Sequence, residues 1–155
     1  MCEEARKEQE KKGVSLTKKK RNLFLGGALL LGLTDLVVQI WLLSRGLSSK
    51  NQGFGWGLPF SLGWQGELRW LLIGAGVLGL IGMGYWYKLS VRSGERQGLL
   101  MVMTGGVVNL IMRLIWGEVV DYLCVAGLCF NLADILITGG VLLVIKDTWK
   151  EKWRK

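Results

Sequence analysis

The chain has 155 residues, of which half are hydrophobic, with eight Trp, a single Pro and no His. This length is typical of one domain, and the absence of His excludes His-based catalytic triads and most zinc sites. The formal net charge is +8, but the Lys and Arg residues cluster in residues 1–21, 88–97 and 146–155, beside alternate ends of apolar runs, which is typical of membrane topology and not of a nucleic-acid-binding surface.

Residues 1–21 are polar and largely basic, and we expect them to form a cytoplasmic tail. Glu3 and Lys7, and likewise Glu8 and Lys12, have the i,i+4 spacing that supports a short solvated helix. The alternative is a binding arm, which the charge pattern favours less. The segment does not resemble a cleaved signal peptide, because the apolar run that follows is too long and ends without a small-x-small site.

The first apolar run, residues 22–44, is long enough to cross a bilayer core of roughly 30 Å. It places Asp35 and Gln39 on one face of a helix, at i,i+4. An acidic side chain at membrane depth is costly and faces protein or water. For Asp35 we weigh two roles, a catalytic group and a buried hydrogen-bond partner between helices, and we favour the second.

Residues 45–69 contain the only proline, Pro59, and many glycines, and we do not expect them to cross the membrane. Large apolar residues alternate there with small or polar ones; they are Phe54, Trp56, Leu58, Phe60, Leu62 and Trp64. This period of two predicts a strand, and Pro59 predicts an edge position or a bend. We expect a small extracytoplasmic β element that either contacts substrate or anchors the chain at the membrane interface through its aromatic side chains.

The second and third apolar runs, residues 70–87 and 98–116, are joined by a short basic loop, residues 88–97. The second run is rich in Gly, which allows helices to pack closely in lipid. The third run places Asn109 and Arg113 on one face, near its outer end. An arginine there either pairs with an acid or extends to the interface.

Residues 117–130 connect the third run to the fourth, residues 131–149. The connection is mostly apolar, so we expect it to lie on the outer membrane surface. Its two cysteines, Cys124 and Cys129, either form a disulfide on an oxidising outer side or remain free thiols in apolar surroundings.

Two acids, Asp121 and Asp134, flank this connection. If the third and fourth runs are antiparallel helices, both carboxylates lie at the same end of the pair and meet there. Two carboxylates held close cannot both ionise, so they share a proton and their pKa values separate. One is then a base and the other an acid at the same pH, as hydrolysis of a peptide bond by water requires. Asn131 shares a helix face with Asp134 at i,i+3, and together with Asn109 it is expected to orient the acids or the substrate backbone.

The motif N-L-I-M-R-x3-G-x-V-x-D, which begins at Asn109, and the motif F-N-x-A-D, which ends at Asp134, resemble the C-terminal half of lipoprotein signal peptidase (signal peptidase II), a family of bacterial intramembrane aspartic peptidases. The resemblance covers residues 22–145. In that family the Asp of V-x-D and the Asp of F-N-x-A-D are the catalytic pair, which implies this role for Asp121 and Asp134. The resemblance also implies a prolipoprotein substrate that bears diacylglycerol on its lipobox cysteine and is cut just before that cysteine, with no metal or organic cofactor.

The third run matches the family motif G-G-x-x-G-N-x-x-D-R in part. Gly105, Asn109 and Arg113 are kept, whereas Val108 stands for the last Gly and Met112 for the Asp. The loss of that Asp removes one expected member of the polar network.

The first run and the outer segment match two further family motifs in part. For D-Q-x-x-K the chain keeps Asp35, whereas Leu36 replaces the Gln and Gln39 replaces the Lys. For N-x-G-x-x-F-G, which in the family belongs to a small sheet that cradles substrate, the chain has Trp in place of Phe; the matching residues are Asn51, Gly53, Trp56 and Gly57.

These features predict a mainly α membrane protein with four transmembrane helices, at residues 22–44, 70–87, 98–116 and 131–149, and a small extracytoplasmic β element between the first and second helices. The peptidase domain is expected to span residues 22–149, between cytoplasmic tails formed by residues 1–21 and 150–155. We expect a monomer in the bacterial inner membrane, in contact with membrane lipid, with both termini cytoplasmic and the active site toward the outer face.

The predicted function is removal of signal peptides from diacylglyceryl-modified prolipoproteins, with Asp121 and Asp134 as catalytic residues. Substrate-binding or supporting roles are expected for Asn51, Gly105, Asn109, Arg113, Asn131 and Asp35. The alternative is a catalytically inactive relative, or a membrane binding or transport protein.

Overall fold

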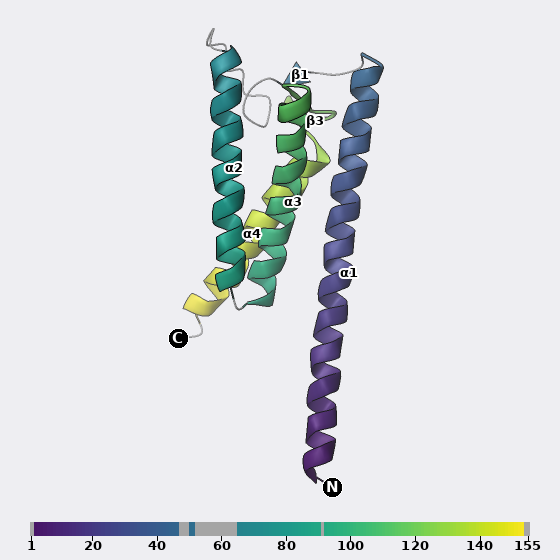
Figure 1. Ribbon diagram of the computed structural model, residues 1–155, viewed down its shortest axis with the longest axis vertical. Coiled ribbons are helices and arrows are strands. Elements are labelled where there is room, and N and C mark those ends of the chain that lie inside the picture. Colours follow the sequence, from purple (N-terminus) through teal and green to yellow (C-terminus); the bar gives the residue numbers. More distant parts are fainter. Residues whose placement is uncertain (1, 47–49, 52–64, 91, 154–155) are drawn as a thin grey trace.

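The computed structural model describes residues 2–46, 50–51, 65–90 and 92–153. It is built from helices α1 (Cys2–Ser44), α2 (Gln65–Leu89), α3 (Ser93–Ile115) and α4 (Leu132–Lys152). Successive helices run in alternate directions, and the short strands lie at one end of the bundle, opposite both chain termini (Figure 1). Helix α3 contacts the other three helices, and its contact with α4 is the most extensive.

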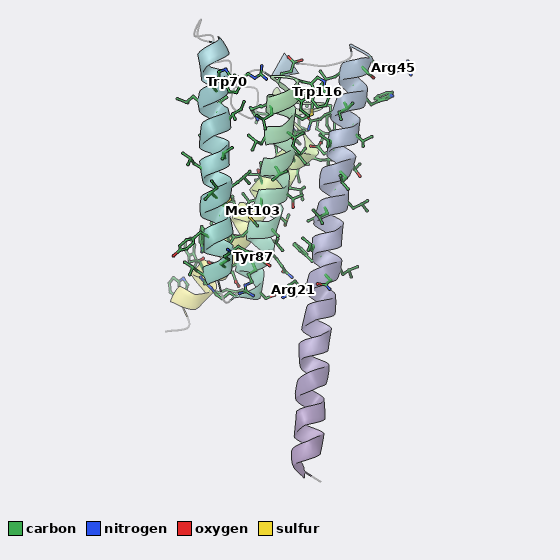
Figure 2. The ribbon with its side chains drawn as sticks, viewed as in Figure 1. Arg21, Arg45, Trp70, Tyr87, Met103 and Trp116 are labelled. Carbon is green, nitrogen blue, oxygen red and sulfur yellow. A yellow bond between two sulfur atoms is a disulfide. The ribbon has the colours of Figure 1, made fainter. Side chains whose placement is uncertain are left out.

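Three of the helices in the described part of the chain are long and apolar enough to cross a membrane, over Arg21–Ser44, Arg69–Leu89 and Ser93–Ile115. Figure 2 shows Trp70 and Trp116 near the strand end, and Tyr87 toward the other end. Aromatic residues at two such levels are typical of the two membrane–water interfaces. The fold is therefore that of a mainly helical membrane protein.

Three helices begin earlier than the apolar runs predicted. Helix α2 starts at Gln65, before the predicted residue 70 and within the predicted outer segment at residues 45–69. Helix α1 starts at Cys2 and continues through the predicted polar tail, so that its N-terminal half projects beyond the bundle in Figure 1. Helix α3 starts at Ser93, within the predicted basic loop at residues 88–97. The cause is a cap from α4, because the backbone N–H of Glu95 donates to an Asp147 carboxylate oxygen at 3.0 Å. A carboxylate at a helix N-terminus satisfies an otherwise unpaired N–H group and interacts favourably with the helix dipole.

The strands form two small antiparallel sheets. β1 (Lys50–Asn51) pairs with β2 (Val119–Val120), and β3 (Leu123–Val125) pairs with β4 (Leu128–Phe130). Of the predicted β element at residues 45–69, only β1 is described as strand; the alternating aromatic stretch at 54–64 lies outside the described residues. Most of the described strand residues instead follow α3, in the connection where the sequence predicted no strand.

A tight hairpin joins β3 to β4. Its two turn residues, Ala126 and Gly127, have φ values of 51° and 85°, as a type I′ turn requires. The turn places Cys124 opposite Cys129 in the register, and the two form a disulfide. Of the two alternatives for these cysteines, the structure therefore contains the disulfide.

Helices α3 and α4 pack through small residues spaced seven apart on each helix. Gly98 lies against the Gly140 carbonyl oxygen, and Gly105 lies against the Ala133 carbonyl oxygen. A Cβ atom at either glycine of α3 would overlap the facing backbone. The absence of side chains thus allows the two backbones to approach closely, as small residues do in membrane helix pairs.

A small apolar core lies beneath the strands, centred on Met112, Val119 and Val120, with Leu36, Leu42 and Leu43 packed against it. Met112 is fully buried there. The residue that replaces the family's Asp therefore packs in the core instead of joining a polar network.

Candidate active site

Polar side chains from three helices and the β2 region meet at the strand end of the bundle. Asp121 directly follows β2, and Asp134 lies in the first turn of α4. Asn109 extends from α3, and Asn131 immediately precedes α4. All four are buried, with exposed fractions of 9% or less.

A chain of hydrogen bonds joins the two carboxylates. The Asn131 side-chain amide donates to an Asp121 oxygen at 3.2 Å and to the Asn109 side-chain oxygen at 3.3 Å. Asn109 in turn donates to an Asp134 oxygen at 2.9 Å. Buried polar groups of this kind are stable only when they are paired, and here each acid accepts a hydrogen bond from an amide that also contacts the other amide.

Asn131 also caps α4. Its side-chain oxygen accepts the backbone N–H of Asp134 at 2.9 Å, the bond that an N-cap residue makes to the third residue of a helix. Asn131 therefore lies outside the helix, in contrast to the prediction that it shares a helix face with Asp134. The cap itself determines where Asp134 lies relative to Asn131.

Arg113 lies one helical turn after Asn109 on α3. Its charge interacts with those of both Asp134 and Asp121. A cation beside two buried acids reduces the electrostatic cost of keeping one of them ionised.

Asp35 lies next to this group, in a second network. It is completely buried and accepts hydrogen bonds from Gln39, from Tyr122 and from the backbone N–H groups of Leu132 and Ala133. It therefore connects α1 to the first turn of α4 and to the residue after Asp121.

Two more residues predicted for the site are placed by their backbone positions. Gly105 packs against Ala133, the residue before Asp134, and so allows Asn109 to reach that acid. Asn51 lies opposite Val119 in the sheet, and Val119 is two residues before Asp121. The side chain of Asn51 lies outside the described part of the structure.

Tyr122 is not among the residues that the sequence patterns single out. Its hydroxyl group donates to Asp35 at 2.5 Å, and Tyr122 adjoins Asp121 in the chain. Burial raises the pKa of Tyr122, and the hydrogen bond to Asp35 raises it further, so the phenol remains protonated and continues to donate. Only its position beside Asp121 could have drawn attention to it, because its partner lies 87 positions away in the sequence.

The arrangement is suited to acid–base chemistry. Two carboxylates on separate elements accept hydrogen bonds from amides, and the charge of Arg113 acts on both. An ionised carboxylate can take a proton from water, and a protonated carboxyl group can give a proton to a leaving group in the same reaction.

Comparisons with known proteins show which family the chain resembles. A family model for signal peptidase (SPase) II matches residues 27–150. The chain is similar to a lipoprotein signal peptidase of Caulobacter vibrioides, with 36% identity over 110 residues that cover 68% of this chain and 64% of that protein. It is also similar to one of Methylobacterium radiotolerans, with 33% identity over 145 residues that cover 86% and 84%, and to one of Streptococcus pyogenes, with 27% identity over 150 residues that cover 86% and 97%.

The fold is similar to that of a solved bacterial membrane enzyme. The TM-score is 0.68 at 19% sequence identity, and the match covers 84% of this chain and 92% of the other. At this identity the likeness concerns the fold alone.

Proposed function

The chain belongs to the signal peptidase II family, and we propose that Asp121 and Asp134 are its catalytic pair. It is an aspartic endopeptidase that removes signal peptides from prolipoproteins. The finer assignment rests on the family resemblance: the substrate bears diacylglycerol on a cysteine, and the cut falls just before that cysteine.

The observation that supports the pair is the hydrogen-bonded chain from Asp121 through Asn131 and Asn109 to Asp134. One carboxylate, ionised, takes a proton from water as the water oxygen attacks the scissile carbonyl carbon. The other carboxyl group, protonated, donates a hydrogen bond to the carbonyl oxygen. The C–N bond then breaks as a proton passes to the leaving amine, and the pair returns to its starting state with one shared proton.

The neighbouring residues keep this pair in place. Asn109 and Asn131 orient the carboxylate oxygens. The positive charge of Arg113 offsets part of the negative charge of the acid pair. The pair titrates jointly, so neither acid alone is assigned the shared proton.

The proposed topology has α4 as a fourth crossing. Its 21 residues correspond to roughly 31 Å of helix, enough for the bilayer core, although it carries charged residues toward both ends, among them Asp134, Lys146 and Asp147. The catalytic end then lies toward the outer face. The basic segments 88–97 and 146–155 lie toward the cytoplasm, as the distribution of positive charge favours.

In this proposal residues 22–149 form a monomeric peptidase domain of the bacterial inner membrane, surrounded by lipid. Residues 1–21 and 150–155 are cytoplasmic. Segment 45–69 is proposed to be extracytoplasmic. The pairing of β1, which includes Asn51, with the strand before Asp121 supports a place for β1 at the substrate side.

Processing of a prolipoprotein on a gel tests the catalytic pair. Asp121→Asn and Asp134→Asn keep the size of the side chain but remove its acid–base function, so each is expected to reduce the rate by at least the 10²–10⁴-fold, in order of magnitude, that general acid–base catalysis contributes. Asp147→Asn is the matched control, since it makes the same change at the other end of α4 and keeps an oxygen that can accept the Glu95 N–H. Processing at the parent rate by either site variant would exclude the pair, and no processing by a correctly inserted parent would favour an inactive relative or a binding protein.

A further inference from the structure

We propose that Gln39 and Tyr122 are positioning residues, which act through Asp35 to set the two proposed catalytic acids relative to each other. The inference rests on the proposed role of Asp121 and Asp134. It explains how the segment that holds Asp121 is attached to the helix that holds Asp134.

Asp35 is the centre of the attachment. It is completely buried, and its two oxygens accept the N–H groups of Leu132 and Ala133 at 3.1 and 3.2 Å. The first N–H groups of a helix have no partner within the helix, and a negative charge there interacts favourably with the helix dipole. A carboxylate of α1 thus holds the turn of α4 that contains Asp134.

Gln39 joins this carboxylate to the strand before Asp121. Its side-chain nitrogen donates to Asp35 at 2.8 Å, and its side-chain oxygen accepts the Val120 N–H at 3.1 Å. Gln39 is itself completely buried. An amide can make both bonds, whereas a Lys has no acceptor and an ionised Glu has no donor.

Tyr122, the residue after Asp121, is attached to the same carboxylate. Its hydroxyl donates to an Asp35 oxygen at 2.5 Å and accepts the Leu132 N–H at 3.4 Å. The residues on both sides of Asp121 in the chain are therefore attached. Val120 bonds to Gln39, and Tyr122 bonds through its own hydroxyl to Asp35. Both attachments lead to the one carboxylate that also holds α4.

This geometry predicts a specific kinetic result. If the attachments set the distance between the acids, their loss misplaces the acids without removing either one. A displacement of about 1 Å costs on the order of 10²-fold in rate. The loss is expected in kcat, whereas KM for the substrate changes little, because the substrate-binding surface remains.

The test measures kcat and KM of the full-length purified enzyme with a synthetic diacylglyceryl-modified lipobox peptide. Gln39→Met and Tyr122→Phe remove the hydrogen bonds at nearly constant volume, and each is expected to lower kcat at least tenfold with KM within about twofold. Gln39→Lys keeps a donor for Asp35 but loses the acceptor for Val120, so it is expected to lower kcat as well. Thr34→Val is the control, since Thr34 is exposed on the same helix and its hydroxyl donates to the Leu30 carbonyl oxygen of that helix.

A fourth variant separates positioning from a general structural role. In Gln39→Glu the introduced carboxyl group offers one donor and one acceptor when protonated, as the amide does, but no donor when ionised. Asp35 and Tyr122 are the titratable groups joined to this position by the network. The ratio of its kcat to that of the parent is therefore expected to rise as pH falls, which a variant that is merely less stable would not do.

The outcomes are distinct. Parent-like kcat for both Gln39→Met and Tyr122→Phe, or a Gln39→Glu ratio that stays constant with pH, would overturn the inference while inactive Asp121→Asn and Asp134→Asn variants still support the proposed function. Active aspartate variants would instead overturn the proposed function itself. If Gln39→Met does not fold, the Tyr122→Phe kinetics and the Gln39→Glu pH profile still decide the matter.

Discussion

Asn131 uses both polar atoms of its side chain. Its nitrogen donates to Asp121 and to Asn109, and its oxygen accepts the Asp134 N–H as a helix cap. One residue thus combines a local structural role at the start of α4 with a link between the proposed catalytic acids. The two roles can be separated because a hydroxyl side chain serves as a cap but cannot make the two donations of an amide.

Asn131→Ser is therefore expected to retain the helix cap but to lose activity. Ser is a good N-cap residue, so Asn131→Ser should be more stable than Asn131→Ala by about 1 kcal/mol, the contribution of the cap, whereas both variants lose the buried donations to Asp121 and Asn109. Thermal unfolding in detergent and a peptide-cleavage assay measure the two effects on the same preparations. A fully active Asn131→Ser enzyme would show that the link between the carboxylates is not needed.

At the scale of elements, the contact between α3 and α4 determines the shape of the site. Asn109 reaches Asp134 because Gly105, one turn earlier on α3, allows the helices to approach closely. At the strand end, the disulfide-linked hairpin of β3 and β4 shortens the connection between Asp121 and α4. Asp121 and Asp134 therefore lie at the two ends of a compact, cross-linked segment.

Gly105→Ala is expected to destabilise the protein by about 1–3 kcal/mol, as overpacking of a tight contact does, and to lower activity. The added Cβ would overlap the Ala133 carbonyl oxygen and lie 2.9 Å from the Ile137 side chain, so α4 would have to move away from Asn109. Gly82→Ala is the matched control on α2, where a Cβ meets no atom within 4 Å. Equal unfolding temperatures for the two variants would contradict the close packing.

At the scale of the whole molecule, the two ends of the bundle have different chemistry. The strand end contains the buried acids and amides. The opposite end is closed by Glu95, which accepts hydrogen bonds from Trp86, Ser90 and Arg92, and by the cap from Asp147. Basic segments flank this opposite end, which faces the cytoplasm in the proposed topology.

Reporter fusions test that topology. A fluorescent protein that matures only in the cytoplasm is expected to fluoresce when fused after Lys155, and a phosphatase that is active only outside is expected to be inactive there. The same pair fused after Ser44, at the end of α1, should give the opposite result. Identical results at both positions would mean that the number of crossings between them is even, which would remove α2, α3 or α4 from the set of crossings.

The sequence by itself determined the class of molecule and pointed to the two acids that are proposed as the catalytic pair. Hydropathy and charge are local properties, so they located the apolar runs, and the motifs around Asp121 and Asp134 indicated the family. Helix ends were less predictable, because the start of α3 depends on Asp147, which is 52 residues from the N–H group that it caps.

Only the tertiary structure decided how the acids are held. Asp35 and Gln39 were recognised as neighbours on one helix face, but their partners Val120, Tyr122, Leu132 and Ala133 are 81 to 98 positions away. The cap made by Asn131, the pairing of β1 with β2 and the disulfide likewise depend on where the backbone travels after each helix. Hydrogen bonds select partners by distance and direction in space, and a linear pattern of residue types contains neither.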